Sequence, residues 1–210
     1  MNFILDAVEA RVLGCLLEKE MATPEYYPLS LNALINACNQ KTNRYPVVSL
    51  DEARVAKALQ ALKEKRLAGQ SDSGRVIKYR HDFIKHNNLI RREAALICLL
   101  LLRGPQTAGE LRSRTERLCT FETPQEVLQY LENLADLGFV RKLPRQAGQK
   151  EQRFVHLLSG EPDSIEQAPV PETVESGDDR LAELERTVQM MQEEIEALKN
   201  EFLSFKKAFE

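Results

Sequence analysis

Two stretches of this chain repeat each other, and this internal repeat limits the fold more than any other feature of the sequence. EARVLGCLLEK, which begins at Glu9, matches EAALICLLLLR, which begins at Glu93, at an offset of 84 residues. Further on, the matched apolar positions are Val55, Leu59, Leu62 and Leu67 in the first copy and Val127, Leu131, Leu134 and Phe139 in the second, at an offset of 72. The first copy therefore holds 12 extra residues between these patterns, and the chain predicts two copies of one supersecondary unit.

Each copy predicts three helices followed by a β-hairpin. Ser30 and Thr107 stand as N-cap residues before the second helices. In the second copy TPQEV provides Thr123 as the next N-cap, Pro124 at the first helical position and Glu126 to close a capping box. SDSG and PRQAGQ supply the hairpin turns. The predicted fold is mainly α with small β wings, a tandem winged helix-turn-helix protein.

The C-terminal part of the chain differs in composition from the two copies. We expect winged-helix domains at residues 1–88 and 89–160, followed by an acidic disordered linker at 161–179, which holds seven acidic residues, three prolines and no basic residue. In residues 180–210 apolar side chains alternate in steps of three and four, which predicts a coiled-coil helix. They are Leu181, Leu184, Val188, Met191, Ile195, Leu198, Phe202, Phe205 and Phe209. The alternative is an amphipathic helix that packs back on the body.

The chain as a whole resembles the bacterial family known as YceH-like. The strings EARVLGCLLEKE, TPEYYPLSLNALINACNQKTNR and LLLRGPQTAGELRSR carry this resemblance, which covers about residues 1–160. It implies a tandem winged-helix fold and neither an activity nor functional residues.

Charge is distributed unevenly. Residues 1–88 contain 13 basic and 10 acidic residues, residues 89–160 contain 11 and 8, and residues 161–210 contain 5 and 14. The two copies are therefore mildly basic, and the C-terminal part is strongly acidic.

The third helices of winged-helix proteins lie in the major groove of DNA. In the first copy, the outward positions of the third helix are Arg54, Lys57, Gln60, Ala61 and Glu64. In the second copy, they are Gln125, Glu126, Gln129, Glu132, Asn133 and Asp136. Acidic side chains repel phosphates, so we expect only the first of these helices to contact DNA.

Basic residues of the wings and of the extra loop complete the predicted DNA interface. The residues assigned to it are Lys41, Arg44, Arg54, Lys57, Gln60, Arg75, Lys78, Arg80, Arg141, Lys142, Arg145 and Lys150. Wings commonly contact phosphates or the minor groove, although basic residues also protect exposed strand edges from pairing. The alternative function is a protein interaction scaffold, similar in architecture to the tandem winged-helix partners of bacterial condensin complexes.

The sequence favours neither catalysis nor a bound cofactor. The three histidines His81, His86 and His156 lack metal-binding spacing, and no phosphate-binding or nucleophile motif occurs. The four cysteines are scattered singly, which predicts small buried thiols and no metal site. The absence of a long apolar run and of a signal-peptide pattern predicts a cytoplasmic protein.

We predict that residues 180–210 make the protein a parallel homodimer. Only parallel pairing places the g-position residues Glu194 and Glu201 opposite the e-position residues Lys199 and Lys206 of the partner. Sedimentation of the full-length protein should show a dimer that is lost in a protein ending at Gly160. Monomers in both samples would contradict the prediction, and crosslinking through a cysteine placed at Leu184 would test the orientation.

Overall fold

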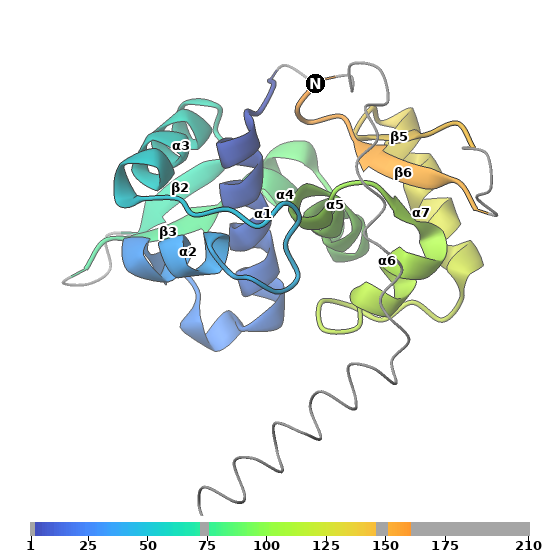
Figure 1. The fold of residues 1–210 in the computed structure, drawn as a ribbon, viewed down its shortest axis with the longest axis horizontal. Coiled ribbons are helices and arrows are strands. Elements are labelled where there is room, and N and C mark those ends of the chain that lie inside the picture. The colour runs from blue at the N-terminus through green and yellow to red at the C-terminus, as the bar shows by residue number, and fades with distance from the viewer. Residues whose placement is uncertain (1–2, 72–75, 146–150, 161–210) are drawn as a thin grey trace, which may run out of the picture. The chain divides into compact units, whose positions relative to one another are not determined.

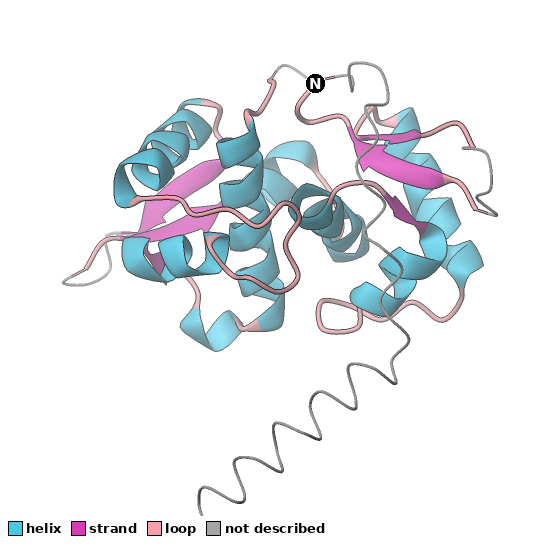
Figure 2. Cartoon of the chain, viewed as in Figure 1, coloured by secondary structure: helices cyan, strands magenta, loops and turns pink. Residues whose placement is uncertain are grey.

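The computed structural model describes residues 3–71, 76–145 and 151–160, and helices dominate this part of the chain (Figures 1 and 2). The elements of the first copy are α1 (Ala7–Ala22), η1 (Pro24–Tyr26), β1 (Leu29–Ser30), α2 (Leu31–Cys38), α3 (Glu52–Glu64), β2 (Ala68–Ser71), β3 (Lys78–His81) and α4 (Phe83–Asn87). Those of the second copy are α5 (Arg91–Arg103), β4 (Gln106–Thr107), α6 (Ala108–Arg114), α7 (Pro124–Asp136), β5 (Val140–Lys142) and β6 (Arg153–His156). The predicted linker and coiled coil at 161–210 lie outside the described residues.

Side-chain caps fix where the helices begin. The Asp6 carboxylate accepts the backbone N–H groups of Val8 and Glu9, both at 2.8 Å, and the Glu9 carboxylate accepts the N–H of Asp6. The predicted caps of the later helices are confirmed, since the hydroxyl oxygens of Ser30, Thr107 and Thr123 each accept a backbone N–H three residues on. These bonds satisfy donors that the first turn of a helix otherwise leaves unpaired.

Each copy contains one three-stranded antiparallel sheet. In the first copy the strand order is β1-β3-β2, and in the second it is β4-β6-β5. The outer strands β1 and β4, of two residues each, were not expected from the sequence, because each consists of a helix N-cap and the residue before it. The result is a mainly helical protein with small antiparallel sheets, compatible with winged-helix architecture.

The two copies repeat each other in hydrogen bonds as well as in element order. The N–H of Asp82 donates to the carbonyl of Leu67, and the N–H of Leu157 donates to the carbonyl of Phe139, both at 2.8 Å. After the third helix, Arg66 has a φ of 59° and its counterpart Gly138 has a φ of 77°. The chain thus leaves α3 and α7 in the same way.

The two copies share one apolar core, and residues Met1–Pro162 form one compact unit. Its centre is the contact between α1 and α5, where the Cys98 thiol donates to the carbonyl of Gly14 at 3.3 Å. These two residues occupy equivalent positions of the repeat, since they are 84 residues apart. Arg91 adds a second link by donating to the carbonyl of Met21 at 3.1 Å.

The helices in the described ranges include none with both the length and the apolar character needed to cross a membrane. Most of α5 is nevertheless buried, with every residue from Glu93 to Leu102 inside the unit. The apolar stretch of α5 therefore serves the shared core of the two copies.

We predict that Gly14→Ala weakens the contact between α1 and α5. A Cβ atom at Gly14 would lie 2.9 Å from Cγ of Leu102 and 3.2 Å from Cβ of Leu101, so the buried Leu102 side chain or one of the helices must shift. Overpacking of this kind costs about 1–3 kcal/mol. Gly109→Ala is the matched control, because Gly109 is also helical but its Cβ would meet only ordinary contacts at 3.7 Å and beyond. Urea unfolding should show Gly109→Ala unchanged or stabilised and Gly14→Ala destabilised relative to it. Equal unfolding free energies would contradict the close approach.

Candidate nucleic-acid interface

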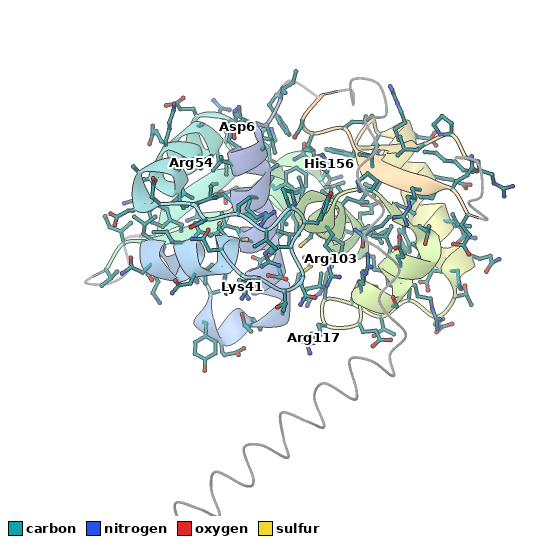
Figure 3. The ribbon with its side chains drawn as sticks, viewed as in Figure 1. Asp6, Lys41, Arg54, Arg103, Arg117 and His156 are labelled. Atoms are coloured by element: carbon teal, nitrogen blue, oxygen red, sulfur yellow. The ribbon has the colours of Figure 1, made fainter. Side chains whose placement is uncertain are left out.

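Helix α3 carries the strongest candidate surface for nucleic acid. The Asp51 carboxylate caps it by accepting the N–H of Arg54 at 2.8 Å, and Val55, Leu59 and Leu62 are buried, as their spacing predicts. This packing turns the opposite face outward. Arg54, Lys57 and Gln60 are exposed on it, and Figure 3 labels Arg54 on α3.

The two cations on this face have no acidic partner. Among the described residues, neither the Arg54 nor the Lys57 side chain forms an ion pair or a hydrogen bond. Gln60 donates to Glu64 at 3.0 Å, which engages the acidic residue at the far end of the face. The Arg54 and Lys57 charges are therefore available to an anionic partner.

Helix α7 presents a different surface at equivalent positions. Gln125, Gln129, Glu132, Asn133 and Asp136 are exposed there. Glu126 is half-buried and forms an ion pair with Arg92 of α5, whose guanidinium lies over the rings of Phe121 and Tyr130 at 5.7 and 5.8 Å from their centroids. The predicted capping box of Glu126 is wrong, because its carboxylate accepts the N–H of Glu122 at 2.8 Å in place of the N–H of Thr123.

Arg44 was expected at the DNA surface, and the structure buries it. Its side chain is 0% exposed and forms an ion pair with Glu18 of α1. All five N–H donors are used: two go to the Glu18 carboxylate at 2.5 and 3.0 Å, and the others go to Gln40 and to the carbonyls of Ala37 and Asn43. Arg44 therefore has no donor left for a phosphate, and its role is to hold the loop between α2 and α3.

A second buried arginine and an asparagine fasten the same loop. Arg11 of α1 donates to the carbonyls of Cys38 and Pro46 at 3.1 and 2.5 Å. Asn39 closes the base of the loop by donating to the carbonyl of Leu50 and accepting its N–H. Arg11 and Asn39 thereby fasten the loop at Cys38, Pro46 and Leu50.

Lys41 is exposed on this loop, but it lies apart from α3. Figure 3 shows Lys41 and Arg54 in separate regions of the first copy. The assignment of Lys41 to the DNA interface stays a prediction from the sequence. The loop turns toward α5, where the N–H of Tyr45 donates to the carbonyl of Leu102 at 2.8 Å.

The wings contribute unequally. Lys78, Lys142 and Arg145 are exposed, and Arg141 is half-buried. Arg80 is exposed but engaged, because it donates to Asp82 at 3.2 Å and to the carbonyl of Gln70 at 3.0 Å. Arg75 and Lys150 lie outside the described residues. Among the described cations of the first wing, Lys78 is thus the exposed one that no acidic side chain engages.

The histidines and cysteines take structural positions. His81 is buried with its Nε2 2.6 Å from the Glu20 carboxylate, and burial lowers the pKa of His156 to about 4. The prediction of buried thiols is confirmed for Cys15, Cys38 and Cys98, whereas Cys119 is half-buried. In the ranges that the structure describes, no group of three or more His, Cys, Asp or Glu side chains is arranged to hold a metal ion.

Sequence reasoning missed the basic residues on the second copy that lie toward the loop. Arg103 ends α5 and donates to the amide oxygen of Asn43, and Arg114 and Arg117 lie at and beyond the end of α6. No pattern in the sequence joins Arg103 to Asn43, because the contact is between segments 60 residues apart.

These features define a class, a mainly helical protein whose two small sheets and third helices are compatible with winged-helix modules. The chain belongs to the family described as "Protein of unknown function, DUF480", whose model matches residues 5–149. A UPF0502 protein of Solibacter usitatus is 51% identical over 214 residues, with both chains fully covered. A UPF0502 protein of Pelobacter propionicus is 50% identical over 220 residues at full coverage, and one of Koribacter versatilis is 53% identical over 195 residues, with 90% of each chain covered. The predicted relationship to a bacterial family without an assigned activity is confirmed.

We predict that Glu18→Gln destabilises the protein by about 3 kcal/mol, because it leaves the buried Arg44 charge without its partner. A double variant, Glu18→Leu with Arg44→Met, should recover much of the loss, since replacing both charges removes the desolvation cost. The free energy of unfolding in urea measures both effects. If Arg44→Met alone left stability unchanged and weakened only DNA binding, the structural role assigned to Arg44 would be wrong.

Proposed function

We propose that the protein is a non-catalytic tandem winged-helix protein that binds duplex DNA through its first copy. The observation that carries this proposal is the pair of exposed cations Arg54 and Lys57 on the outer face of α3, which have no partner in the part of the chain that the structure describes. Binding of such cations to phosphates releases condensed counterions, which supplies most of the affinity for DNA of any sequence. Gln60, on the same face, has the amide that hydrogen-bonds to base edges in the major groove.

The first wing supports the same docking mode. Lys78 is exposed on β3, directly before the half-buried Tyr79, and is a cation that a wing could place on a phosphate. In the second copy, Lys142 and Arg145 are exposed while α7 is acidic. The second wing is therefore proposed to contact the phosphate backbone without its third helix entering the groove.

The proposed protein acts as a homodimer. The coiled-coil pattern of residues 180–210 supports dimerisation from the sequence alone. Two first copies in one dimer would contact two half-sites, which raises the affinity for DNA by making the second contact intramolecular.

The outer face of α7 favours a second candidate function, a scaffold for a protein partner. This face exposes Glu132 and Asp136 without any Lys or Arg, and the adjacent Leu137 is 57% exposed. An exposed leucine next to uncompensated acidic residues suits a partner with a basic and apolar surface. In this case the second copy would recruit protein, and α3 would not need to touch DNA.

We predict that Arg54→Gln with Lys57→Gln weakens binding to a duplex of about two helical turns by roughly tenfold at low salt. The slope of log affinity against log salt should fall by about two, one for each lost phosphate contact. Both side chains are exposed, so the unfolding free energy should change by less than about 0.5 kcal/mol. Fluorescence anisotropy across a salt series measures affinity and slope together.

The matched control is Gln125→Glu with Gln129→Glu on α7. It changes the net charge by the same amount as the α3 double variant, and on the equivalent helix of the other copy. The control should retain affinity within about twofold. An equal loss in both variants would mean that only the overall charge matters, and an undiminished affinity in the α3 variant would remove α3 as the docking surface.

A further inference from the structure

A second basic region lies where the loop between α2 and α3 meets the second copy. Arg103 of α5 donates one Nη2 hydrogen to the amide oxygen of Asn43, and Lys41 is exposed two residues earlier on the same loop. Arg114 of α6 donates to the amide oxygen of Gln106, and the Gln106 amide donates to the carbonyl of Gly104, the residue after Arg103. Burial lowers the pKa of the Arg103 guanidinium, and the positive charge of Arg114 lowers it further. Figure 3 shows Lys41, Arg103 and Arg117 in one part of the view, away from Arg54.

The guanidinium of Arg103 is incompletely satisfied. Its Nε is buried and has no hydrogen-bond partner among the described residues, and no carboxylate in that part of the chain forms an ion pair with it. A buried donor left unpaired is costly, and native proteins normally supply a partner from the chain, from water or from a bound ion. The C-terminal position of Arg103 on α5 is favourable for a cation but does not pair this N–H.

The nearby acidic groups are already engaged. Both oxygens of Glu18 accept from Arg44. The Glu110 carboxylate accepts from Arg153 at 3.0 Å and lies 3.7 Å from Arg114. Arg114 directs its other contact to the amide oxygen of Gln106 at 2.7 Å. Positive charge at this junction is therefore not balanced by the acidic residues around it.

We propose that Arg103 and Arg114, with Lys41 at the rim, form a binding site for a phosphate group at the junction of the two copies. The Nη groups of Arg103 would donate to the phosphate oxygens, whose geometry the planar guanidinium fork matches, while the buried Nε stays inside the protein. Both copies contribute to the site, so it exists only because α1 and α5 pack together. It is separate from α3 and does not rest on the proposed docking of that helix.

Pyrophosphate titration of the full-length protein tests the site directly. At an ionic strength of about 0.01 M, where screening is weak, Arg103→Gln should weaken pyrophosphate binding about tenfold, the loss expected for one charged hydrogen-bonding group. Lys41→Gln should weaken pyrophosphate binding about twofold to threefold, because the charge of the exposed Lys41 is screened by solvent. Replacing this exposed side chain should leave the fold intact. Lys85→Gln is the control, because Lys85 is an exposed cation of α4 outside both proposed surfaces, and this variant should bind pyrophosphate as the wild type does.

A competition experiment with duplex DNA identifies the source of the phosphate. If the phosphates belong to nucleic acid, duplex DNA should displace pyrophosphate, and Arg103→Gln should lower duplex affinity. If the ligand is a free phosphate compound, duplex and pyrophosphate should bind independently, and either result supports the site.

The proposal is overturned if the wild type does not bind pyrophosphate, or if Arg103→Gln and Lys41→Gln both bind it unchanged. A protein that binds pyrophosphate but no duplex would refute the proposed function and leave this site standing.

Discussion

The contact between α1 and α5 is the interaction on which the rest of the structure depends. A glycine at position 14 lets the two helices approach until the Cys98 thiol reaches a backbone carbonyl. This approach joins two units, each with its own three-stranded sheet, into one core. It also fixes where the loop of the first copy meets the second, since Tyr45 and Asn43 contact Leu102 and Arg103 at the end of α5.

The extra loop of the first copy is held by buried charge. Arg44 and Glu18 form an ion pair with little exposure, and Arg11 adds hydrogen bonds to two loop carbonyls. Burying such groups is costly unless every donor and acceptor is paired, and here all five Arg44 donors are. A fully paired network favours one loop conformation over others, which sets the start of α3 at Asp51 and thereby the direction of its outer face.

Local patterns in the sequence predicted much of this fold. The caps at Ser30, Thr107 and Thr123 and the buried faces of α3 and α7 follow from spacing and side-chain chemistry within one turn of helix. The exposed cations Arg54 and Lys57 follow from the same periodicity.

Features set by contacts between distant segments could not be predicted in this way. The burial of Arg44 depends on Glu18, 26 residues earlier, and the placement of Arg103 depends on Asn43, 60 residues earlier. A basic residue in a loop looks the same in sequence whether it faces solvent or a buried carboxylate. The strand β4 pairs with β6 across more than 40 residues, so the sequence of its two residues alone did not predict a strand. The linker and coiled coil remain predictions from composition and heptad spacing.

The central claim is that the first copy, and not the second, presents its third helix to DNA. Site-specific photocrosslinking tests it most directly, with a benzophenone amino acid placed at Gln60 on α3 or at Glu132 on α7, which are equivalent exposed positions. The account predicts crosslinks to a duplex from position 60 and few or none from position 132. Crosslinking from position 132 alone, or from neither position under conditions where the duplex is bound, would contradict it.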